Sequence, residues 1–213
     1  MNLDQRVRTH LVNSIVGFRS VCLIGTINER KKTNLAIFNS IVHIGASPPL
    51  IGFFVRPDCV ERHTLSNILE TRYYTINHIN ESIFRQAHQT SARYSENVSE
   101  FEVTQINEEY KEDFLAPFVE DSHIQLGVEF KERIDIESNG TILLIGEIKQ
   151  LYFQADCLCD DGFVDIEKAK SITCSGLDRY HSTKHISRLS YANIDTLPYD
   201  LTLKYNNVTN ISS

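Results

Sequence analysis

Several polar side chains that can hold an anion stand directly after apolar stretches of this chain. They are Asn39, Ser40, Arg56, His63, Thr64, Asn67, Thr90 and Ser91. Hydroxyl groups, backbone N–H groups at a helix start and a guanidinium all donate hydrogen bonds to anionic oxygens. Together these residue types favour binding of a phosphate monoester. Taken singly, Arg56 fits a surface charge and Thr64 fits an ordinary helix-start residue, so the interpretation depends on the whole set.

Other familiar chemistries find little support in the sequence. It contains no G-x-S-x-G, H-E-x-x-H, P-loop or G-x-G-x-x-G pattern. His181 and His185 have the spacing that puts two imidazoles on one helix face, but no third metal ligand is evident beside them. Cys157 and Cys159 would share one face of a strand and also lack further ligands. A solvated surface for the histidines and ordinary packing for the cysteines are therefore favoured.

Composition indicates an ordinary globular protein. The 213 residues suffice for one sizeable core, and we expect a single domain over 1–195 followed by a polar tail over 196–213. A net charge of -7 argues against a protein that grips nucleic acid. No signal peptide and no apolar run near the roughly 20 residues of a membrane span are present. The five cysteines form no disulfide or paired C-x-x-C pattern, so we expect a cytoplasmic protein that binds neither nucleic acid nor membrane.

Apolar, β-branched stretches separated by turn signals predict a mainly β, antiparallel protein with peripheral helices. Strands are predicted at 19–27, 33–44, 50–55, 73–79, 134–136 and 141–148. The Asn139-Gly140 pair predicts a tight hairpin between the last two. Helices are predicted at 61–70, with Asp58 as a capping signal for Glu61, and at 81–88. The acidic segment 95–122 is expected to be loop and short helix, and a solvated loop is favoured over a lid.

The order of several short motifs resembles the flavin reductase-like family. The motifs are the run 33–40 (TNLAIFNS), the run 47–53 (SPPLIGF) and the run 63–68 (HTLSNI), followed by 90–92, 101–102 and 144–148. The resemblance extends from about Ser20 to Ser182. It implies the FMN-binding split barrel, an antiparallel split β-barrel, and a homodimer with the flavin at the subunit interface.

The resemblance also implies which residues hold FMN. Asn39 and Ser40 should lie along the flavin ring, and the backbone from Phe38 to Ile41 should meet its pyrimidine edge. Phe54, Val55 and Arg56 should line the ribityl and phosphate side. The implied phosphate partners are Arg56, His63, Thr64, Thr90 and Ser91, with Asn67 bracing the loop. Many members carry lysine or serine near His63, so Thr64 is the better candidate; no catalytic side chain and no metal site are implied.

The family hosts more than one function, so three hypotheses stand. The first is an oxidoreductase in which NAD(P)H, as co-substrate, passes hydride to the flavin, which then serves an electron-accepting oxygenase partner. The second is an FMN-bound electron carrier, or flavin-binding protein, without nicotinamide activity of its own. The third is an interaction module that has lost the cofactor.

Overall fold

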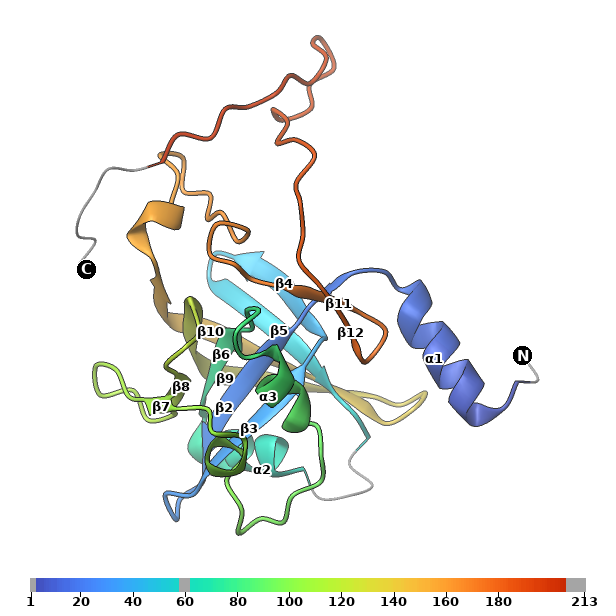
Figure 1. The fold of residues 1–213 in the computed structure, drawn as a ribbon, viewed down its shortest axis with the longest axis vertical. Helices are drawn as coiled ribbons and strands as arrows, with labels where there is room; N and C mark the ends of the chain where they lie inside the picture. Colours follow the sequence, from blue (N-terminus) through green and yellow to red (C-terminus); the bar gives the residue numbers. More distant parts are fainter. Residues whose placement is uncertain (1–2, 58–61, 206–213) are drawn as a thin grey trace.

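A computed structural model describes residues 3–57 and 62–205 and shows a mainly β, antiparallel architecture, as predicted (Figure 1). The main sheet has seven strands in the order β3-β2-β6-β9-β10-β5-β4. Its strands are β2 (Cys22–Ile27), β3 (Thr33–Phe38), β4 (Ile41–Ala46), β5 (Pro49–Val55), β6 (Tyr73–His78), β9 (Ile124–Ile136) and β10 (Thr141–Phe153). Two small sheets join β1 (Arg19–Ser20), β11 (Thr173–Ser175) and β12 (Arg179–His181), and β7 (Glu108–Glu109) with β8 (Phe118–Val119).

The two edge strands of the main sheet are neighbours in the sequence. β3 ends at Phe38 and β4 begins at Ile41, yet they lie at opposite ends of the strand order. Two residues can span only about 10 Å, so the sheet must curl until its two edges meet. The prediction of one strand over 33–44 is therefore wrong, because the chain leaves one edge at Asn39 and joins the other after Ser40.

The hairpin at Asn139-Gly140 forms as predicted, and it is longer than the sequence pattern suggested. β9 and β10 pair from Thr141 opposite Ile136 to Phe153 opposite Ile124, with two register shifts. Gly140 has a φ of 74° in this turn, which glycine adopts at no steric cost. The buried parts of both strands line the main core together with β2, β5 and β6.

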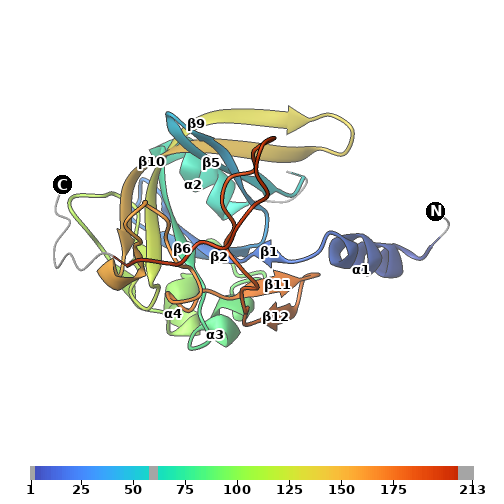
Figure 2. The ribbon, with the colours of Figure 1, turned by 90° about the horizontal axis from the view of Figure 1, so that it is seen from above.

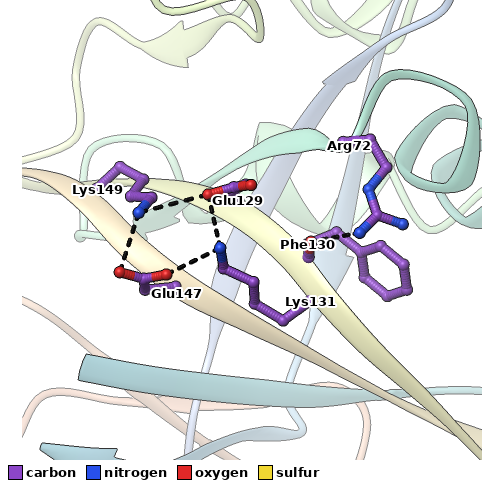
Figure 3. Close-up of polar contacts among 6 residues, drawn as sticks. All are labelled: Arg72, Glu129, Phe130, Lys131, Glu147 and Lys149. Atoms are coloured by element: carbon purple, nitrogen blue, oxygen red, sulfur yellow. Dashed lines mark hydrogen bonds and ion pairs between the residues drawn. The ribbon is translucent and has the colours of Figure 1, made fainter. Parts of the chain in front are cut away.

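The outward face of β9 and β10 carries a ladder of alternating charges (Figure 3). Lys131 Nζ lies 2.8 Å from Glu129 and 2.9 Å from Glu147, and Lys149 Nζ lies 2.9 Å from Glu147. Hydrogen bonds from these ammonium groups lower the pKa of both glutamates. Because four charges on this face require water, the ladder fixes which face of the hairpin turns to solvent.

Helix α2 (His63–Thr71) covers the core, close to the predicted 61–70. The proposed capping residues Asp58 and Glu61 lie outside the described residues. The helix ends at Arg72, whose φ of 71° reverses the chain. The Arg72 guanidinium lies 4.4 Å from the centre of the Phe130 ring and donates a hydrogen bond to the Phe130 carbonyl, which fastens the end of α2 to β9 (Figure 3). The second predicted helix, 81–88, is α3 (Phe84–Gln89).

The acidic segment 95–122 contains loop and a short helix, as predicted, but it is not a solvated loop, which corrects that part of the expectation. It contains the short helix α4 (Glu100–Thr104) and strands β7 and β8. Phe101, Ala116 and Phe118 are each at most 2% exposed and belong to core clusters. The sequence did not indicate this burial, because acidic residues surround the buried apolar residues along the chain.

Two segments project from the body of the fold. Helix α1 (Gln5–Ile15), which the sequence analysis did not predict, extends to one side (Figure 2). After β12 the chain runs away from the sheet as an extended segment (Figure 1). The described part of the chain contains no helix with the length and apolar character of a membrane span.

We predict that Gly25→Ala destabilises the fold by about 1–3 kcal/mol, because a Cβ at Gly25 would lie 2.6 Å from Thr75 Oγ1 and nearer still to the Pro117 carbonyl oxygen. Urea denaturation measures this loss. Gly45→Ala is the matched control, since the nearest atom to its added Cβ would be the Pro48 oxygen at 3.7 Å. Equal stability of the two variants would contradict the tight packing of 95–122 on β2.

Candidate functional site

A cavity of about 680 Å³ opens where the two edges of the main sheet meet. This volume lies in the range of small-molecule sites. Ten of the residues predicted from the sequence line it: Phe38, Asn39, Ser40, Phe54, Val55, Arg56, His63, Thr64, Thr90 and Ser91. Ile41 and Asn67 do not line it, because Ile41 packs against the core and Asn67 lies on the buried side of α2. The chain thus brings together predicted residues from four separate segments.

The cavity is locally basic in an acidic protein. Four arginines line it, namely Arg19, Arg56, Arg62 and Arg93, against the two carboxylates of Glu96 and Glu100. The whole chain carries a net charge of -7. A concentration of guanidinium groups inside one concave site favours an anionic ligand there.

Arg62 is one of three lining arginines that the sequence analysis missed, the others being Arg19 and Arg93. It occupies the N-cap of α2, and its Nε is buried without a hydrogen-bond partner among the described residues. A buried guanidinium N–H that lacks an acceptor costs free energy, which a ligand oxygen would recover. Its position just before His63 and Thr64 was the signal available in the sequence, since a phosphate site at a helix start commonly recruits a flanking cation.

The start of α2 is fixed by a buried network of side-chain hydrogen bonds. Asn34 Nδ2 donates to Thr64 Oγ1 at 3.0 Å, and both Asn34 and Asn67 donate to Thr26 Oγ1. Thr64 is 6% exposed and lines the cavity. Its oxygen accepts from Asn34, and its own proton can be donated to a ligand oxygen in the cavity. Asn67 therefore braces the site through Thr26, without reaching the cavity.

Asn39 and Ser40 act mainly as structural links at the point where the sheet edges meet. Ser40 Oγ donates to the Phe54 carbonyl at 3.0 Å and accepts from the Phe54 N–H at 3.1 Å, so its hydroxyl takes the place of a backbone pair. Asn39 Nδ2 donates to the Gly176 carbonyl at 3.0 Å. Both residues face the cavity, but their side-chain donors already have protein partners.

Thr90 and Ser91 differ in what they offer to a ligand. Thr90 is 4% exposed, and its hydroxyl donates to the Ala87 carbonyl at 2.8 Å. Its backbone N–H, like that of Ser91, is bonded to the last turn of α3. Ser91 is exposed, so its hydroxyl is the donor that this turn presents to the cavity.

An apolar wall faces these polar groups. Phe38, Phe54 and Val55 line the cavity. Phe38 packs edge-on against Phe53, and Phe53 against Tyr74, with ring centroids 5.0 and 5.6 Å apart. Because Phe53 and Tyr74 are fully buried, the wall is held from behind by the core.

Glu100 is a buried acid at the inner side of the cavity. It is 5% exposed, and its Oε2 accepts from the Leu35 N–H at 3.1 Å. Burial raises the pKa of this carboxyl, while the Leu35 hydrogen bond and the nearby charges of His63 and Lys32 act in the opposite direction. The arginine-lined cavity thus contains one carboxyl group, that of Glu100, whose charged form is disfavoured by burial.

The other sequence candidates lie away from this cavity. His181 is in β12 and His185 in an extended segment, so the helical spacing does not apply; they bond to Ser175 and Glu167 respectively. Cys157 ends a short 3-10 helix, not a strand, and both Cys157 and Cys159 are buried. The thiols are packed in the interior.

The sequence profile of the flavin reductase like domain family matches residues 18–162. This chain belongs to that family. The match begins at the strands of the main sheet and includes every residue of the predicted set. Family membership assigns the chain to the flavin-related oxidoreductases, with the split-barrel fold.

Solved structures agree with this assignment. A protein described as a flavin reductase with a split barrel domain, from Shewanella frigidimarina, is 46% identical, with a TM-score of 0.87 over 90% of this chain and 95% of that one. Nitrilotriacetate monooxygenase component B from Bacillus cereus is 21% identical, with a TM-score of 0.79 over 88% and 95%. An FMN-binding protein from Thermus thermophilus is 15% identical, with a TM-score of 0.65 over 79% and 88%. The last two show a shared fold.

The residues of the cavity fit a phosphorylated flavin such as FMN. The unpartnered Nε of Arg62 and the first turn of α2 suit a phosphate group, because no side-chain acceptor at the N-cap occupies the N–H groups of that turn. The wall of Phe38, Phe54 and Val55 suits a planar aromatic ring. Charged and apolar parts of the site thus match the two parts of the cofactor.

We predict that Glu100→Gln stabilises the fold more at neutral than at acidic pH. Burial raises the pKa of Glu100 in the folded state, so the stability that its protonated form contributes is lost as pH rises through the folded pKa. Glutamine keeps an oxygen for the Leu35 N–H and carries no charge. Urea denaturation at both pH values measures the difference.

Glu102→Gln, on the same helix but with a side chain 72% exposed, is the matched control and should give no such gain. A stability change in Glu100→Gln that is equal at both pH values would contradict the assigned pKa shift.

Proposed function

We propose that this protein binds FMN in the cavity and uses it as an oxidoreductase that takes reducing equivalents from NAD(P)H. The observation that carries the proposal is a basic cavity beside an apolar aromatic wall, in an acidic chain of a flavin family. Bound flavin would supply the redox chemistry, by accepting hydride from nicotinamide and passing electrons onward. The protein supplies binding, orientation and electrostatics.

Each side of the cavity has a role in this proposal. Arg56, Arg62 and the Thr64 hydroxyl hold the phosphate, and the network behind Thr64 keeps that hydroxyl aimed at it. The aromatic wall orients the ring, and the fully buried residues behind it keep water from that side. No general base is required, because hydride transfer depends on close approach of the two rings.

The proposal includes a homodimer with the flavin at the subunit interface and an oxygenase as electron acceptor. In support of the dimer, α1 borders the cavity through Asn13 and exposes apolar side chains next to it. In support of the oxygenase, the fold matches component B of a monooxygenase. The buried free thiols of Cys22, Cys157 and Cys174 favour a cytoplasmic location.

A second candidate is an FMN-bound electron carrier, or flavin-binding protein, without nicotinamide activity. The likeness to the Thermus thermophilus FMN-binding protein favours it. An absorbance spectrum of the purified protein, followed by mixing with FMN and NADH or NADPH, separates the two. Loss of nicotinamide absorbance supports the reductase, whereas bound flavin with no such loss supports the carrier. A protein that stays colourless and binds no added FMN would overturn both.

We predict that Arg62→Ala and Arg56→Ala each raise the Kd for FMN roughly 10- to 100-fold, as expected for loss of a hydrogen bond to a charged group. Riboflavin, which lacks the phosphate, should bind both variants as it binds the wild type. Fluorescence titration with the two flavins measures this.

Arg85→Ala is the control, because Arg85 is exposed on α3 and stacks on Phe84 outside the cavity. A variant that loses FMN and riboflavin equally would show that its arginine supports the fold or the ring, and would remove it from the phosphate set.

A further inference from the structure

Helix α1 is an amphipathic helix whose apolar side chains are all exposed. Val7, Leu11 and Ile15 form a stripe at intervals of four residues, and Ile15 is 78% exposed. None of the residues of α1 is buried. Figures 1 and 2 both show the helix standing clear of the barrel. Its apolar side therefore lacks a partner within the described chain.

Helix α1 nevertheless has a well-formed N-terminal cap. Asp4 caps the helix, with its carboxylate accepting from the Arg6 N–H at 2.9 Å and from the Val7 N–H at 3.4 Å. An isolated helix of 11 residues is marginal in water even when it is capped. A helix of this length gains most of its stability from packing of its apolar face, so α1 requires a covering surface.

The second unpartnered surface is the C-terminal arm, defined as residues 186–201. Its two halves pair, because Ser190 N–H donates to the Tyr199 carbonyl at 2.9 Å and Leu201 N–H donates to the Arg188 carbonyl at 2.7 Å. Every residue from 191 to 200 is exposed. The exposed side chains include large apolar ones, namely Ile186, Leu189, Tyr191, Ile194, Leu197 and Tyr199. An isolated two-stranded hairpin is also marginal in water.

The base of the arm is anchored to the body of the protein. Arg188 forms an ion pair of 2.8 Å with Asp161, and the Tyr205 hydroxyl donates to Asp165 at 2.7 Å. The arm is thus held in place at its base and presents an apolar surface at its tip. This is the arrangement of an element that binds outside its own chain.

The charges of the two surfaces are complementary. α1 carries Arg6 and Arg8 and no acidic residue, whereas the arm carries Asp195 and Asp200, and its one cation, Arg188, is paired with Asp161 at the base. Opposite charges around an apolar contact favour one pairing and orient it. Two copies related by a two-fold axis would form the contact twice.

We propose that α1 of one copy packs against the C-terminal arm of a second copy, and that this exchange joins the dimer. The proposal rests on the dimer of the proposed function and names its surface. α1 borders the cavity, since Asn13 lines it and accepts a hydrogen bond from Arg19, which also lines it. The partner's arm therefore covers the rim of the flavin site.

The test exploits the fact that α1 makes no buried contact in its own chain. In Leu11→Glu/Ile15→Glu the monomer fold should be unchanged, while the dimer dissociation constant should rise on the order of 100-fold, because two buried apolar side chains are replaced by charges. Gln5→Glu/Thr9→Glu adds the same charge to the opposite face of the helix and should leave the dimer intact. Sedimentation velocity over a range of concentrations measures both.

Photo-crosslinking locates the contact directly. A benzophenone amino acid at Val7, in a mixture of isotope-labelled and unlabelled copies, should link to residues 186–201 of the other copy. A monomeric wild type, a dimer indifferent to Leu11→Glu/Ile15→Glu, or crosslinks that map elsewhere would overturn the inference. So would α1-dependent binding to anionic lipid vesicles without a change in association. A separate FMN titration of the same variants measures flavin binding. The absence of the α1–arm contact is thereby distinguished from the absence of a flavin site.

Discussion

The structure depends on the two-residue crossing at Asn39 and Ser40. Because β3 and β4 are joined by so short a link, the seven-stranded sheet has to close on itself at this point. Ordinary backbone pairing is interrupted there, and the Ser40 hydroxyl replaces it by bonding both the N–H and the carbonyl of Phe54. The cavity lies beside this crossing, since Asn39, Ser40 and Phe54 line it. The constraint that closes the sheet therefore also positions the site.

The hydrogen-bond donors of the site are held in place by a network in which the Thr26 hydroxyl is the central acceptor. Asn34 and Asn67 both donate to its hydroxyl oxygen, and Asn34 also holds Thr64. At its other end α2 is fixed by Arg72 on Phe130. Since both ends of α2 are fixed, the first turn of the helix keeps its direction toward the cavity. Rigid donors lose little entropy when an anion binds.

Features set by neighbouring residues could be predicted from the sequence. The Asn139-Gly140 turn, the core strands and α2 follow from local patterns. The ordered motifs identified the family resemblance, and ten of the twelve site residues that it implied line the cavity. Features set by distant contacts could not. The break in 33–44 arises from closure of the sheet, and Phe118 is buried because 95–122 folds back onto β2 and β6. Nothing in the sequence distinguishes Arg62 from a surface arginine, because the burial of its Nε depends on the tertiary structure.

The charge distribution gives the cavity a selectivity that its shape alone would not. A chain of net charge -7 repels an anionic ligand at long range, whereas the four arginines that line the cavity attract it. Exposed charges are screened within roughly 8–10 Å at moderate salt, whereas a concave site with low-dielectric walls is screened less. Elsewhere the acids are matched locally, as in the Glu129, Lys131, Glu147 and Lys149 ladder, where both signs alternate. The cavity therefore combines an excess of arginines with a concave surface, which an exposed ladder of alternating charges lacks.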